Sequence, residues 1–192
     1  TKSGNGTLLL SGINTYSGTT TISAGTLKIS GQLGSGIYSS NIINNGILQH
    51  SSSSNQTLSG VISGSGSLTK DGSGELIISG INSYSGSTTI SAGSIRISAD
   101  SGLGSAPSSA TSSHLVLSNG SILKTTATFT LNSNRGITLA SGTGYFKPSS
   151  STELTYAGII AGSGNLKSSH GTLILNGINT FTGTTLDRSG TL

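Results

Sequence analysis

The acidic residues are the side chains of this sequence that could support hydrolysis: Asp71, Glu75, Asp100, Glu153 and Asp187. Cleavage of a glycosidic bond needs two carboxyl groups at a fixed separation, and a calcium site needs several oxygen ligands together. No two of these acids have a spacing that would pair them along one strand. We therefore expect solvated surface charges, although a groove that brought Glu75, Asp71 and Glu153 within about 6 Å would favour an enzyme.

The histidines and serines offer the other familiar chemistry. His50, His114 and His170 lie far apart in a chain without cysteine, so we expect exposed or turn histidines and no metal site. Serine is abundant, but no Gly-x-Ser-x-Gly elbow occurs and no histidine stands near a candidate nucleophile. The Gly-Ser-Gly segments 64–66 and 162–164 precede strand-like runs rather than open a helix, which predicts turns and not phosphate loops. The sequence thus predicts no catalytic residue and no cofactor.

One long segment recurs and organises the chain. Residues 1–30 match residues 69–98 without a gap at an offset of 68. A partial third copy spans residues 167–192, and its Leu173 lies 97 positions after the matching Leu76 of the second copy. The first two copies are identical at about two thirds of positions, which chance does not produce over such a length. The chain is therefore expected to be one repeat domain, 1–192, cut from a longer protein.

Composition and spacing predict a parallel β-helix. Only 31% of the residues are apolar and 7% are charged, 30 are glycine, and short runs rich in Ile, Val and Thr alternate with turn residues. No segment shows helical periodicity. If each coil takes about 20 to 25 residues, the offsets of 68 and 97 are about three and four coils, and the whole chain makes about eight coils. Lys28 and Arg96 fall between inward-facing apolar residues and should point outward.

Six residues recur at matching points of the repeat and are predicted to be structural rather than ligand-binding. The asparagines should bond the backbone at a corner of the coil, at about 1 kcal/mol each. If the offsets are whole numbers of coils, matching residues should occupy the same corner, three or four coils apart. The positions are Asn14, Asn82 and Asn179, each followed two residues later by Tyr16, Tyr84 and Phe181.

The net charge of +4 does not indicate nucleic-acid binding. The nine cations are scattered singly along the sequence, with no cluster and no interleaved aromatic residues, whereas contact with a phosphate backbone needs a basic patch. No apolar run approaches the roughly 18 residues that span a bilayer as a helix. We expect no nucleic-acid partner.

The segment 64–98, GSGSLTKDGSGELIISGINSYSGSTTISAGSIRIS, resembles the passenger-associated strand repeat of bacterial autotransporters. The resemblance covers well over half of the chain, and the positions in register are Leu68, Lys70, Gly72, Gly74, Leu76, Gly80, Asn82, Tyr84, Gly86 and Thr88. It implies a right-handed parallel β-helix in a passenger that is extracellular or held at the bacterial outer-membrane surface. Membrane contact would come only through a C-terminal barrel absent from this stretch. The third copy departs from the pattern at Asp187, where the others have Ile22 and Ile90, which predicts a slipped register or a frayed last coil.

These observations predict a noncatalytic scaffold acting in adhesion or self-association. The partners expected are a glycan or protein of a host or bacterial surface, or sister passengers associated end to end or side by side. One alternative is a glycan-processing enzyme or toxin passenger whose site lies outside this stretch. A minor alternative is an ice-binding solenoid, because Thr19 and Thr21 could form an outward row with Ser87 and Thr89.

Overall fold

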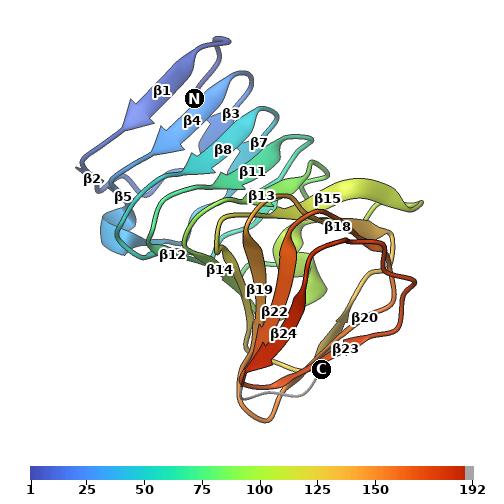
Figure 1. Cartoon of the computed structure of the whole chain (residues 1–192). Coiled ribbons are helices and arrows are strands. Elements are labelled where there is room, and N and C mark those ends of the chain that lie inside the picture. The colour runs from blue at the N-terminus through green and yellow to red at the C-terminus, as the bar shows by residue number, and fades with distance from the viewer. Residues whose placement is uncertain (189–192) are drawn as a thin grey trace.

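The computed structural model describes residues 1–188 and shows a β-solenoid, in which the chain winds through about nine turns of parallel strands (Figure 1). The first strand, β1 (Thr7–Leu10), and the last described strand, β24 (Thr185–Arg188), lie at opposite ends of the stack. The predicted all-β parallel helix is confirmed, with about nine turns in place of eight. The first coils lie at the low end of the expected range: Leu8, Leu27, Leu48 and Leu68 stack directly on one another at intervals of about 20 residues.

The strands of successive coils form three faces. The first face contains β1 (Thr7–Leu10), β4 (Thr26–Ile29), β8 (Ile47–His50), β11 (Ser67–Lys70), β13 (Thr88–Ile90), β15 (Thr111–Leu117), β18 (Arg135–Leu139) and β21 (Ile160–Gly162). The second contains β6 (Ile37–Tyr38), β9 (Gln56–Leu58), β12 (Glu75–Ile78), β14 (Ser94–Ile97), β16 (Ile122–Thr125), β19 (Thr143–Pro148), β22 (Asn165–Ser169) and β24 (Thr185–Arg188).

The third face is divided into two shorter sheets. One contains β3 (Thr20–Ile22), β7 (Ile42–Asn44) and β10 (Ile62–Ser63), and the other contains β17 (Phe129–Leu131), β20 (Glu153–Tyr156) and β23 (Thr172–Leu175). A small parallel pair, β2 (Ile13–Asn14) and β5 (Gln32–Leu33), follows the first-face strands β1 and β4 in chain order. Two short 3-10 turns, Gly34–Gly36 and Asp100–Leu103, lie in the irregular segments that follow β5 and β14.

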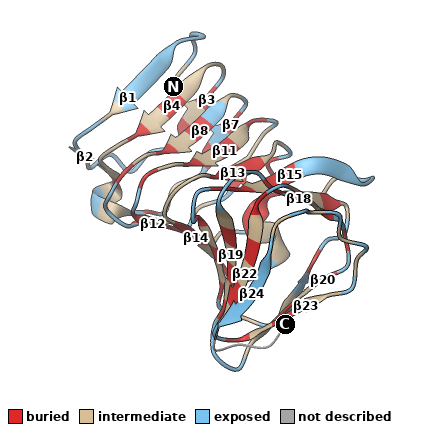
Figure 2. Ribbon diagram, viewed as in Figure 1, coloured by how far each residue is buried: buried red, intermediate tan, exposed pale blue. Residues whose placement is uncertain are grey.

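Alternation along each strand builds the core. Leu27 and Ile29 are buried and Lys28 between them is not, and Ile95, Arg96 and Ile97 repeat this order one face later. The predicted outward direction of Lys28 and Arg96 is therefore confirmed. Each fully buried leucine or isoleucine contributes about 1.5–3 kcal/mol of transfer free energy, so the stacked apolar columns supply most of the stabilisation. Figure 2 shows buried residues on the strands within the stack and exposed residues on β1 and β24.

The three repeat copies begin on three different faces, and the prediction that matching residues share a corner is wrong. Three coils carry Leu8 to Leu68 on the first face, and the remaining eight residues carry the chain to Leu76 on the second. Four further coils carry Leu76 to Ser168, and Leu173 then lies on the third face. Each offset is thus a whole number of coils plus about one third. The coil length lies within the expected range, but the assumption that the offsets are whole multiples of it is wrong.

A left-handed glycine makes the same turn in the first two copies. Gly25 has φ +68° and Gly93 has φ +64°, a region that residues with a Cβ atom rarely enter. A Cβ atom on Gly93 would also lie 2.4 Å from the carbonyl oxygen of Gly72 in the previous coil. The Ala-Gly pair of the repeat is therefore required both by the backbone angle and by the close stacking of coils.

Arg135 holds the longest irregular segment against the stack. Its side chain is 1% exposed and forms an ion pair with Asp100, with Nε 2.8 Å from Oδ1. The guanidinium also donates to the carbonyl oxygens of Leu103 at 2.9 Å and Gly104 at 2.6 Å. Five donors in a fixed fork suit a guanidinium to this clustered set of oxygens.

Among the described residues, no helix has the length and apolar character needed to cross a membrane.

Candidate functional site

The second face carries a column of cations that the sequence does not reveal. Arg96, Lys124 and Lys147 are direct neighbours in β14, β16 and β19, so their outward side chains stack at the strand spacing of about 4.8 Å. Arg188 on β24 pairs with Ser169 on β22, and Lys167 on β22 pairs with Tyr145. We call these residues, Arg96, Lys124, Lys147, Lys167 and Arg188, the basic column.

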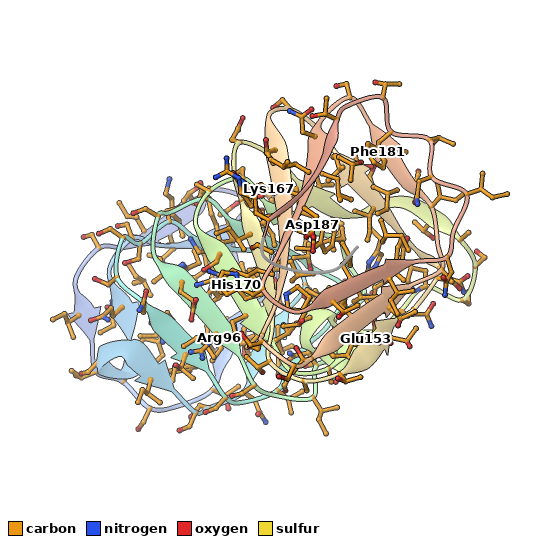
Figure 3. The ribbon with its side chains drawn as sticks, turned by 60° about the horizontal axis from the view of Figure 1, so that its bottom comes forward. Arg96, Glu153, Lys167, His170, Phe181 and Asp187 are labelled. Carbon is orange, nitrogen blue, oxygen red and sulfur yellow. The ribbon has the colours of Figure 1, made fainter. Side chains whose placement is uncertain are left out.

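A groove of about 580 Å³ lies over the start of the basic column. Its lining residues are Glu75, Arg96, Lys124, Thr126, Lys147, Pro148, Ser149, Ser150 and His170. In Figure 3, Arg96, His170 and Lys167 follow one side of the stack, and Glu153 and Phe181 lie on the other. The groove therefore combines cations with hydroxyl groups, and among the described residues Glu75 is the one acid in its lining.

Glu75 neutralises one end of the basic column. Its Oε1 lies 2.9 Å from Nε of Arg96, and its Oε2 is paired with the ammonium group of Lys124. Burial raises the pKa of the carboxyl group, but the hydrogen bond from Lys124 and the charges of Lys124 and Arg96 outweigh it and lower the pKa overall. The carboxylate is therefore ionised at neutral pH and is a poor proton donor. Within residues 1–188, Lys147, Lys167 and Arg188 form no ion pair.

Unequal coil lengths conceal this column in the sequence. Arg96 and Lys124 are 28 positions apart and Lys124 and Lys147 are 23 apart, so no single period connects them. The description of the cations as scattered without a cluster is wrong for the folded chain. A signal was available in the inward-outward alternation, since all three occupy outward positions between buried neighbours.

The other acids lie in separate surroundings. Asp71 accepts hydrogen bonds from Gln49 at 2.7 Å and from Ser51, Asp100 is paired with Arg135, and Glu153 accepts from Thr155 at 3.2 Å. Neither Asp71 nor Glu153 lines the groove with Glu75. The arrangement that would have favoured an enzyme is therefore not formed in the described part of the chain.

Asp187 keeps the strand register. It pairs with Ser168 in the last two strands of the second face, so the proposed slip of register is wrong. The residue occupies the inward column but is exposed, because β24 is the outermost described strand of this face. Residues 189–192, which include the end of the third copy and of the expected frayed coil, lie outside the described residues.

The histidines occupy three unrelated sites. His50 is 1% exposed, so the prediction that it is exposed or in a turn is wrong. Burial, followed by the charge of Lys70 in the next coil, lowers its pKa to about 4. His114 is also buried, and burial and the charge of Arg135 lower its pKa. His170 lies in a turn with φ +82° and lines the groove. Among the described residues no three metal-binding side chains cluster.

The repeat asparagines bond the backbone, as predicted. Asn82 Oδ1 accepts from the backbone nitrogen of Ile62 at 2.8 Å, and its Nδ2 donates to the carbonyl oxygens of Gly80 and Gly102 at 3.1 and 3.3 Å. Asn14 donates to Gly12 at 2.8 Å and Gln32 at 3.2 Å, while Asn179 accepts from Ile160 at 3.0 Å. Each asparagine thus ties its coil to the one before or after it, but on a different face.

The aromatic repeat positions also have local roles. Tyr16 and Tyr84 share hydrogen bonds with the hydroxyl groups of Thr20 and Thr88 at 3.0 and 2.8 Å. Phe181 has no hydroxyl group and packs, partly buried, against the core. These contacts are internal to the coils, and the residues do not line the groove.

The threonine rows required for ice binding are not formed. Thr21 stacks on Ile43 of the third face, whereas Thr89 stacks between Thr69 and Val116 of the first face. The two Thr-x-Thr segments therefore do not lie above one another. The expected outward row is wrong for the same reason as the shared corners: the offset of 68 residues is not a whole number of coils.

Comparisons with known proteins agree with this architecture. The passenger-associated-transport-repeat family matches residues 1–29, 68–97 and 167–192. The chain is also 35% identical over 231 aligned residues to the adhesin BmaC autotransporter of Brucella suis biovar 1 (strain 1330). That alignment covers 96% of this chain and 7% of the relative, so the chain spans only a small part of the relative's length. No solved structure matches the chain.

Proposed function

This chain belongs to the autotransporter passengers that carry passenger-associated repeats, and we propose that it serves as a noncatalytic scaffold for adhesion or self-association. Such a passenger is a secreted or cell-surface protein. We place the chain outside the cell or on the outer-membrane surface, where the curated relative's designation as an adhesin supports a role in contact.

The observation that carries this proposal is that Glu75 is held as an ionised carboxylate by its ion pairs with Arg96 and Lys124. Within residues 1–188 it is the one acid in the lining of the groove, and two cations hold it ionised, so this part of the chain offers no pair of carboxyl groups there for glycoside cleavage. Elsewhere the outward residues of the strands are mostly small and polar and repeat from coil to coil. Such a surface supports contacts that are weak individually and are multiplied by repetition.

The experiment displays the full-length passenger on cells and scores attachment to surfaces and clumping between cells. We expect that Glu75→Ala will not abolish either activity, because no reaction depends on this carboxylate. Ile78→Asp should abolish both, because it places a charge at a position that is 1% exposed and unfolds the coil. The neighbouring Ile77→Asp, on the outward side of the same strand, is the matched control and should keep the fold.

Two outcomes would contradict the scaffold. If Glu75→Ala silences both activities while circular dichroism shows an intact fold, a discrete site exists and the glycan-processing alternative gains support. If a passenger that lacks this stretch but remains displayed attaches and clumps normally, the chain is not the adhesive element.

A further inference from the structure

The basic column concentrates the charge of the protein on one face. Five of the nine cations belong to it, whereas the outward positions of the first face hold Lys28 alone among charged residues. On the second face, Glu75 is the acid at the outward positions. The positive field is therefore directional, in a protein that is otherwise nearly uncharged.

The neighbouring cations of the basic column repel one another and lower the stability of the solenoid. Like charges directly opposite on neighbouring strands are destabilising, and Lys124 and Lys147 are such a pair. Glu75 relieves the repulsion at Arg96 and Lys124 but lies at the other end of the column from Lys147, Lys167 and Arg188. An anion with charges repeated along the solenoid axis would relieve it along the whole column.

The groove has the further groups that a carbohydrate requires. Thr126, Ser149 and Ser150 supply hydroxyl groups beside the cations. Tyr145 lies two residues before Lys147 on β19 and pairs with Lys167 on β22, and the ammonium group of Lys167 is 4.8 Å from its ring centroid. Hydroxyl groups suit the ring oxygens and hydroxyl groups of a sugar, whereas single-stranded nucleic acid is held by several aromatic platforms for its bases.

We propose that the basic column binds an acidic polysaccharide, with the polymer lying along the solenoid axis and its sulfate or carboxylate groups on successive coils. This inference rests on the proposed adhesive function and names its partner class. Glu75 competes with the polymer for Arg96 and Lys124 and so limits the affinity. Uncharged glycans lack the groups that the column recognises.

The test measures binding of fluorescent dextran sulfate, with neutral dextran and single-stranded DNA as comparisons, to the full-length passenger displayed on cells. Dextran sulfate should bind and neutral dextran should not. Lys147→Ser should weaken binding several-fold and lower the slope of log K against log salt by roughly one, the value for loss of one contact to a polyanion. Lys28→Ser, the same change on the first face, should leave binding unchanged.

The variant Glu75→Gln distinguishes a binding role of the column from loss of structure, because damage to the fold would not increase binding. It frees Arg96 and Lys124 and should strengthen the binding of dextran sulfate several-fold. Equal losses in Lys147→Ser and Lys28→Ser, weaker binding in Glu75→Gln, or tighter binding of DNA than of dextran sulfate would each overturn the proposal. A passenger that attaches to cells without binding dextran sulfate refutes this inference alone, whereas one that binds dextran sulfate without promoting attachment or clumping refutes the proposed function alone.

Discussion

Two ionisable side chains inside the first face should make the stability of the solenoid depend on pH. His50 and Lys70 are stacked neighbours in the inward column between Ile29 and Ile90, and they are 1% and 0% exposed. Neither ring nitrogen of His50 has a hydrogen-bond partner, whereas Lys70 donates to the carbonyl oxygen of Gly72. Burial lowers the pKa of His50 from 6.5 to about 4 and that of Lys70 from 10.5 to about 8.

The sign of the effect follows from which state binds more protons. Between pH 4 and 6.5 the unfolded chain protonates His50 and the folded chain does not, so the free energy of unfolding falls as the pH falls. Each bound proton contributes about 1.4 kcal/mol per pH unit, or about 2 kcal/mol between pH 6.5 and 5. Lys70 acts in the same direction in its own range, so stability should rise again by about 2 kcal/mol between pH 8 and 9.5.

Urea unfolding followed by circular dichroism at a series of pH values measures both limbs. The chosen pH ranges avoid the region below pH 4.5, where protonation of Glu75 begins to remove its contribution to stability. They also avoid the region near pH 10, where tyrosines of the unfolded chain ionise but Tyr84 and Tyr156 of the folded chain do not, because their pKa values are raised to about 12. His50→Leu should reduce the acid slope by about 1.4 kcal/mol per pH unit, and Lys70→Met should flatten the basic limb.

The comparison of the acid slopes of the unmodified chain and His50→Leu tests whether His50 causes the pH dependence. Because His114 also has a lowered pKa, the unmodified chain can show more than one proton of slope, and the difference between the chains isolates His50. An acid slope that is the same in both chains would refute the reasoning, as would stability that falls between pH 8 and 9.5 in the unmodified chain.

Three further changes test the contacts between coils. Arg135→Ala should lower the free energy of unfolding by about 3 kcal/mol, which is the lower end of the range for a broken buried ion pair because Asp100 is 26% exposed. In a double-mutant cycle with Asp100→Ala, additive losses of stability would contradict the pairing. Gly93→Ala should cost more than Gly120→Ala, since both have positive φ but only a Cβ at Gly93 meets a carbonyl oxygen; equal melting temperatures would refute the clash. Asn82→Ala should cost about 2 kcal/mol in urea unfolding because it leaves buried backbone groups unpaired, and a change below about 0.5 kcal/mol would show that water replaces the amide.

The strands and their facing were determined by local sequence. The alternation of apolar residues around Lys28 and Arg96 was predicted as the structure has it, because a period of two in apolar residues is set by the pleat of a strand. The outward direction of Lys28 and Arg96 and the backbone hydrogen bonds of Asn82 were predictable for a similar reason. Each depends on neighbours within a few residues, or on backbone groups that every coil supplies.

The relation between coils was decided only by the tertiary structure. A repeat offset of 68 residues is compatible with coils of 20 or 23 residues, and only the observed stacking of Leu8 on Leu27 and Leu48 distinguishes them. That small difference in coil length moves each repeat copy to a new face and separates Thr21 from Thr89. It also brings Arg96, Lys124 and Lys147 together across unequal intervals. Which outward side chains become neighbours depends on the accumulated length of every turn and loop between them, a quantity that strand periodicity does not contain.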